Sequence, residues 1–86
     1  MDINQLSKIV KTKIKNNIKI QNIVIEDKTY LHLNHANHDE KKLHIKVSID
    51  SIDLKKMDKV KRTRIIYKLL GHELKNYIHS IQLNII

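Results

Sequence analysis

A stretch near the middle of the chain alternates between apolar and polar side chains without interruption. Its apolar positions are Leu43, Ile45, Val47 and Ile49, and its polar positions are His44, Lys46, Ser48 and Asp50. A period of two is typical of a β-strand with one buried and one solvated face. The stretch therefore predicts a strand in a sheet that is covered on one side only, with the polar side chains, His44 among them, in solvent.

Helical periodicity precedes this strand. Asp2 and Gln5 have the spacing of a capping box, which predicts that a helix starts here and runs to about Asn17. The apolar positions of that helix are Ile3, Leu6, Ile9, Val10 and Ile14. Apolar residues then alternate over residues 18–25 with a change of parity near Gln21, which predicts a second strand with a bend or bulge.

The second half of the chain predicts two helical segments and a last strand. Ser51 can cap a single helical turn, and Asp58 can cap a longer helix. The apolar stripe of that longer helix is Val60, Tyr67, Leu70, Leu74 and Ile78, widened by Ile66. A strand follows over residues 80–85. The order α-β-β-α-α-β predicts an α+β fold, with a three-stranded sheet packed on helices in one domain spanning residues 1–86.

Composition narrows the function of such a domain. The 86 residues include no cysteine, which excludes a disulfide framework, a thiolate zinc site and an iron–sulfur cluster held by this chain's own sulfur. Gly71 is the only glycine and no serine lies in a nucleophile-elbow motif, so a phosphate-binding loop and a common hydrolase centre are absent. A chain this short has a thin core and little room for a deep substrate pocket. We expect a binding module and no enzyme.

The hydropathy pattern also bears on localisation. No apolar run approaches the length of a membrane span, and Met1 leads directly into the periodic pattern with no signal-peptide h-region. We expect a cytoplasmic protein that does not bind membranes.

Histidines are the candidate metal ligands, because imidazole nitrogen suits iron, zinc, copper and nickel. His32, His35 and His38 lie close together in the polar segment after residue 27, which reads as a strand end and an exposed loop. They can ligate a metal or be ordinary polar loop residues. His79 stands where the long helix gives way to the last strand. It is either a half-buried structural histidine or a ligand offered at the edge of the sheet.

Basic residues cluster at the start of the long helix. They are Lys59, Lys61, Arg62, Arg64 and Lys68. With a net charge of +8, the chain favours acidic partners. The cluster is a candidate contact for nucleic-acid phosphate or for an acidic protein, and it does not separate the two. Much of the charge can equally reflect the heavy Ile, Lys and Asn usage of an AT-rich coding genome.

Three stretches resemble the BolA family, over nearly the whole chain from Asp2 to Ile85. IEDKTYLHLNH (25–35) is similar to the D-x-S-x-x-H start of the family's variable loop, and HIKV (44–47) leads to SIDL (51–54), where the family shows S-x-x-F. RTRIIYKLL (62–70), EL (73–74) and IHSI (78–81) are similar to R-H-R-x-x-Y-x-x-L…E-L…H-A-L. Thr63 replaces the central histidine of R-H-R and cannot ligate a metal, whereas Leu54 replaces phenylalanine and keeps an apolar side chain for burial.

The resemblance implies a class II KH-like fold and a monothiol glutaredoxin as partner. In that picture the two proteins share a two-iron two-sulfur (2Fe-2S) cluster, with sulfur from the glutaredoxin cysteine and glutathione. This chain supplies His79 and a loop histidine, best aligned with His35, with His32 and His38 as alternates. The long helix with its basic start is the expected docking surface. The protein holds no cluster alone and is a monomer or weak dimer when free.

A second hypothesis follows from the same resemblance, because BolA-like proteins are linked to transcriptional control. In it the chain is a nucleic-acid-binding regulator that contacts DNA through the basic start of the long helix.

Overall fold

The helices and strands follow the order that the hydrophobic pattern predicts, with the long helix divided in two. The computed structural model describes residues 1–29 and 42–86. Its elements are α1 (Ile3–Asn17), β1 (Asn22–Asp27), β2 (Leu43–Asp50), α2 (Ile52–Lys55), α3 (Lys59–Leu69), α4 (Gly71–Asn76) and β3 (Ile78–Ile85). The expected α+β class and three-stranded sheet are confirmed, and nothing in the topology contradicts the class II KH-like label.

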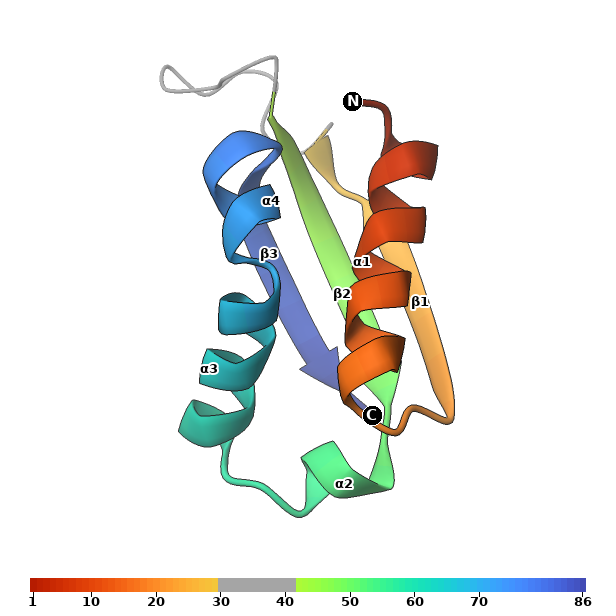
Figure 1. The fold of residues 1–86 in the computed structure, drawn as a ribbon, viewed down its shortest axis with the longest axis vertical. Helices are drawn as coiled ribbons and strands as arrows, with labels where there is room; N and C mark the ends of the chain where they lie inside the picture. The colour runs from red at the N-terminus through yellow and green to blue at the C-terminus, as the bar shows by residue number, and fades with distance from the viewer. Residues whose placement is uncertain (30–41) are drawn as a thin grey trace.

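The sheet forms one layer and the helices form the other. Figure 1 shows α1 and the α3–α4 pair on the same side of the sheet, with α2 at the end where β2 finishes. The strand order is β1-β2-β3, with β1 antiparallel and β3 parallel to β2. The parallel pairing requires the chain to return from the end of β2 to the start of β3, and α2, α3 and α4 make that return on the helical side.

Among the described residues, one cluster of buried apolar side chains joins the two layers. The alternate residues Ile45, Val47 and Ile49 of the central strand are at most 1% exposed, as the period of two predicts. The rest of the buried cluster is Leu6, Val10, Ile14, Ile23, Leu54, Ile66, Leu70, Ile78 and Ile81. Full burial of one such side chain contributes about 1.5–3 kcal/mol, so this interface is the main source of stability.

The three predicted helix caps are confirmed. The Asp2 carboxylate accepts a hydrogen bond from the Gln5 amide at 2.8 Å, and the Gln5 side chain accepts one from the Asp2 amide at 3.3 Å. Ser51 accepts from the Leu54 amide at the start of α2, and Asp58 accepts from the Lys61 amide at the start of α3. Each cap satisfies an amide that has no partner within its own helix.

The buried stripe predicted for the long helix is partly wrong. Val60 and Tyr67 are 59% and 39% exposed, whereas Ile66 and Leu70 are fully buried. Val60 and Tyr67 lie on α3 together with the buried Ile66, so the predicted stripe was centred on the wrong face of this helix. The helix also breaks at Leu70, where φ is −100° and ψ is 18°, so residues before and after the break do not share one continuous face.

Two strand starts also differ from the prediction. β1 starts at Asn22, so the change of parity near Gln21 lies just before the strand and not within it. Here the Gln21 amide donates to the carbonyl oxygen of Asp50 at 2.8 Å. β3 starts at Ile78, before the expected position 80.

Candidate functional site

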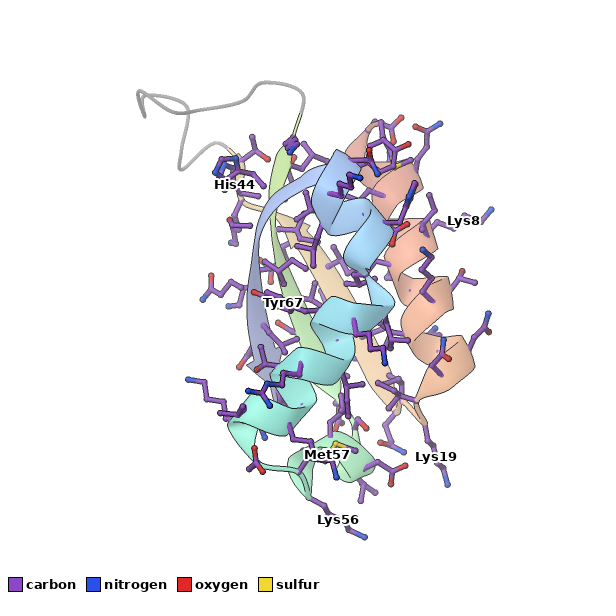
Figure 2. The ribbon with its side chains drawn as sticks, turned by 60° about the vertical axis from the view of Figure 1, so that its left-hand side comes forward. Lys8, Lys19, His44, Lys56, Met57 and Tyr67 are labelled. Atoms are coloured by element: carbon purple, nitrogen blue, oxygen red, sulfur yellow. The ribbon has the colours of Figure 1, made fainter. Side chains whose placement is uncertain are left out.

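The histidine singled out by the sequence, His79, lies beside His44 at one end of the sheet. Because β2 and β3 are parallel, their first residues are neighbours at the same end, where Figure 2 shows His44. Thr29 and Lys28 also lie there, since the His44 amide donates to Thr29 Oγ1 at 3.1 Å and the Lys28 amide donates to the His44 carbonyl oxygen at 2.7 Å. The loop candidates His32, His35 and His38 fall in 30–41, outside the described residues.

A β-bulge at the start of β3 sets the position of His79. The residue before His44 pairs with Ile78 while His44 itself pairs with Ser80, so His79 has no partner residue on β2. Ile78 and Ile81 are both buried although they are three positions apart, because the bulge interrupts the alternation. Strict alternation would place His79 on the buried face with Ile81. The bulge instead leaves it exposed and not half-buried, and its role as a ligand stays a prediction.

His44 is buried, contrary to the prediction that it is solvated. It is 5% exposed, its Nδ1 lies 2.7 Å from Ser80 Oγ, and its ring centroid lies 4.5 Å from that of His79. The alternation assigned the correct face, but His44 packs there against Ser80 and His79 of the neighbouring strand β3. Ser48, on the same face of β2, is also buried, at 8% exposed.

The His79 ring makes few contacts within the protein. It packs against the His44 ring at an interplanar angle of 36°, and it forms no hydrogen bond or ion pair with the described residues. Across residues 1–29 and 42–86, no group of three or more His, Cys, Asp or Glu side chains could hold a metal ion. Among the described residues, this end of the sheet therefore offers the exposed imidazole of His79, which suits ligation of a metal shared with other ligands.

The carboxylate of Glu26 is engaged in an ion pair on β1. Its Oε2 lies 3.0 Å from the Lys28 Nζ. Hydrogen bonding and charge attraction from Lys28, helped by Lys46, lower the pKa of the Glu26 carboxyl. Glu26 is therefore ionised at neutral pH.

The start of α3, which carries most of the basic cluster, lies at the opposite end of the molecule from the start of β3 (Figure 1). Lys59, Lys61, Arg64 and Lys68 are exposed and Arg62 is half-buried. In Figure 1, α3 starts beside α2, whereas β3 starts beside the end of α4, and the longest axis of the molecule is 38 Å. Lys68, near the end of α3, lies between the two ends. A partner that contacts His79 does not meet the start of α3 unless it spans most of that length.

Comparison with known proteins decides the family. Residues 14–86, most of the chain, match the sequence model described as BolA-like protein. The chain belongs to the BolA family. The resemblance noted in the sequence is thereby confirmed.

Two curated relatives of this BolA-family chain are informative. It is 34% identical over 80 residues, 93% of this chain and 75% of the other, to the "DNA-binding transcriptional regulator BolA" of Haemophilus influenzae. It is 31% identical over 77 residues to "Protein BOLA1, chloroplastic" of Arabidopsis thaliana, covering 86% of this chain and 48% of that protein. None of these names is that of an enzyme.

Solved BolA structures have the same fold. The BolA domain of SufE1 from Arabidopsis thaliana superposes with a TM-score of 0.75 at 27% identity, over 99% of this chain and 92% of that one. BolA1 from the same plant superposes with a TM-score of 0.76 at 30% identity, over 98% of this chain and 92% of that one.

No helix within the described ranges is long and apolar enough to span a bilayer.

One feature of this BolA-family site was not expected from the sequence. The buried His44 looked like a solvated strand residue, although it heads one of the three BolA-like stretches. No local signal could have identified its burial, because that burial follows from the central position of β2 between β1 and β3.

Proposed function

We propose that this chain is a BolA-like accessory protein that binds a monothiol glutaredoxin and shares a 2Fe-2S cluster with it, in iron–sulfur cluster handling or iron sensing. His79 supplies one imidazole nitrogen and a loop histidine, His35, supplies another, with His32 and His38 as alternates. The glutaredoxin cysteine and glutathione supply the sulfur ligands. The observation that carries the proposal is an exposed imidazole on a bulge, beside the two points where the chain enters and leaves residues 30–41.

The residues of this end of the sheet fit one part of such a cluster. In a shared cluster this chain needs to supply only one or two ligands. Because it has no cysteine, those ligands are nitrogen or oxygen atoms. Neutral imidazole is an accepted ligand of iron, and histidine in place of thiolate raises the reduction potential of a 2Fe-2S centre. His79 must be deprotonated to bind, so assembly should weaken as the pH falls.

The net charge of the chain contributes to the attraction of its partner. A net charge of +8 attracts an acidic partner from a distance. We propose that the protein acts in the cytoplasm. Family membership alone does not determine the compartment, because one relative is named as chloroplastic.

The test is anaerobic cluster reconstitution on a monothiol glutaredoxin with glutathione, followed by addition of this protein. We expect new visible absorption and circular dichroism bands with wild type and their loss with His79→Ala. His72→Ala is the matched control, because His72 is an exposed histidine whose ring faces Tyr77 and not the histidine pair. A spectrum that is the same with His79→Ala as with wild type would contradict the proposal.

A second function, DNA binding by α3, has its own supporting observation. The Haemophilus influenzae relative is named as a DNA-binding regulator, and four of the five basic residues on α3 are exposed. If this function holds, Arg62→Ala/Arg64→Ala weakens binding to duplex DNA. The slope of log K against log salt should become shallower by about 1.8, at about 0.9 for each lost phosphate contact. No change in affinity or slope would leave this function without support.

A further inference from the structure

The contact between His44 and His79 joins a buried ring to an exposed one. The two ring centroids are 4.5 Å apart at an interplanar angle of 36°. His44 is 5% exposed, while His79 is exposed on the bulge. The exposed His79 ring therefore packs against the buried His44 ring.

Several contacts hold His44 in place. Its Nδ1 lies 2.7 Å from Ser80 Oγ, a distance typical of a strong hydrogen bond. Its amide donates to Thr29 Oγ1 at 3.1 Å, and its carbonyl oxygen accepts from the Lys28 amide at 2.7 Å. His44 also sits on the central strand, paired on both sides. Its ring is thus held by the hydrogen bond to Ser80, and its backbone by the bonds to Thr29 and Lys28 and by the sheet.

His79 has no such support of its own. It is the extra residue of the bulge, lacks a partner residue on β2, and forms no hydrogen bond within the described residues. An exposed side chain in that position samples several rotamers and must be ordered before it can ligate a metal. Ordering one such side chain weakens binding by about two- to tenfold, unless the protein has already restricted it.

We propose that His44, held by Ser80, is a positioning residue that restricts the His79 imidazole to one orientation before a metal or partner arrives. This inference rests on the proposed function of His79 as a ligand. His44 acts only through the ring of His79 and touches no cluster atom in this account. It also gives a reason for a histidine at a buried strand position, since a flat ring held by a hydrogen bond stacks on another ring.

The variants that test the proposal separate the ring from its hydrogen bond. His44→Leu removes the aromatic ring and keeps an apolar side chain, whereas His44→Phe keeps a ring and loses the bond to Ser80. Ser80→Ala removes the bond and keeps the imidazole. We expect His44→Phe and Ser80→Ala, which both keep a ring and lose the bond, to show a partial defect, and His44→Leu to show the full one.

Two readouts are needed. The first is NMR of the His79 side chain in the full chain without metal, where averaged rotamers report a freed imidazole. The second is titration of this protein into 2Fe-2S glutaredoxin, monitored by circular dichroism. We expect about two- to tenfold weaker formation of the mixed cluster with His44→Leu, and unchanged binding to cluster-free glutaredoxin.

The outcomes distinguish the two proposals. If His79→Ala leaves the cluster spectrum unchanged, the proposed function fails, and the NMR readout still decides whether His44 orders His79. If His79→Ala abolishes the spectrum but His44→Leu leaves both the His79 rotamer distribution and the titration unchanged, only the positioning role is overturned. Should His44→Leu fail to fold, Ser80→Ala carries the test, and a His79 ring as ordered as in wild type refutes the role.

Discussion

At the scale of single residues, a buried carboxylate ties the helix before His79 to the rest of the protein. Glu73 on α4 is 2% exposed, and both of its carboxylate oxygens lie 2.8 Å from the Lys13 Nζ on α1. Nothing in the local pattern identifies this pair, because the two residues are far apart in the chain. Burial of a carboxylate is tolerated only when its charge is compensated, which Lys13 does here.

The pair yields a prediction about stability. Lys13→Met leaves the Glu73 carboxylate buried without its cation, and we expect a loss of about 1–3 kcal/mol in the free energy of unfolding. The figure is at the lower end for buried pairs because Lys13 keeps 38% of its side chain exposed. Urea unfolding measures it, with Lys8→Met, a change to an exposed lysine of the same helix, as control. Equal effects of the two substitutions would show that the pair contributes nothing specific.

At the scale of elements, periodicity and caps could be predicted from the sequence, and interruptions could not. α1, β2 and the caps at Asp2, Ser51 and Asp58 follow from local residue types. The break at Leu70 and the bulge at His79 depend on how α3, α4 and β3 pack together, which no window of sequence shows. The candidate site was predictable to the same degree. His79 was identified by resemblance, but its exposure and its contact with His44 required the bulge.

The caps are expected to differ in strength according to burial. The Ser51 hydroxyl is fully buried, accepts from the Leu54 amide and donates to the Lys19 carbonyl oxygen at 2.8 Å. Ser51→Ala loses both bonds and should cost about 1–2 kcal/mol. Asp58→Ala removes an exposed cap and should cost less, about 0.5–1 kcal/mol. Chemical denaturation of both variants checks the order, and the reverse order would contradict the description of the two caps.

The only glycine offers a stabilising substitution. A Cβ placed on Gly71 meets no atom within 4 Å, and its φ is not positive. Alanine favours a helix over glycine and restricts the unfolded chain, so Gly71→Ala should stabilise the protein by about 0.5–1 kcal/mol. A higher midpoint of thermal unfolding is the expected result. A lower one would indicate that the break between α3 and α4 needs glycine.

At the scale of the whole molecule, the two candidate surfaces are separated although they are close in sequence. α3 and α4 run along the molecule and β3 runs back, so the start of α3 and the start of β3 lie at opposite ends (Figure 1). The resemblance to the BolA family predicted the fold, but residue order alone did not reveal this separation. The expected docking surface on the long helix is correspondingly divided, since only the end of α3 and α4 approach His79.

The separation predicts independence of the two surfaces. His79→Ala should remove the mixed cluster without affecting DNA binding, and Arg62→Ala/Arg64→Ala should do the reverse. The free-energy effects of substitutions at sites more than about 10 Å apart, without shared contacts, usually add to within about 0.5 kcal/mol. Cluster titration and DNA titration of the combined variant measure the coupling between them. A larger coupling would mean that one partner covers both ends.

The central claim, that this chain donates imidazole to a shared cluster, is tested most directly by labelling only its histidines. The protein is prepared with ¹⁵N-histidine, mixed with unlabelled 2Fe-2S glutaredoxin and glutathione, and the cluster is reduced for pulsed electron paramagnetic resonance. We predict ¹⁵N hyperfine couplings of directly bound imidazole, with the contribution of His79 lost in His79→Ala and retained in His72→Ala. A reduced mixed complex without any ¹⁵N coupling would contradict the account.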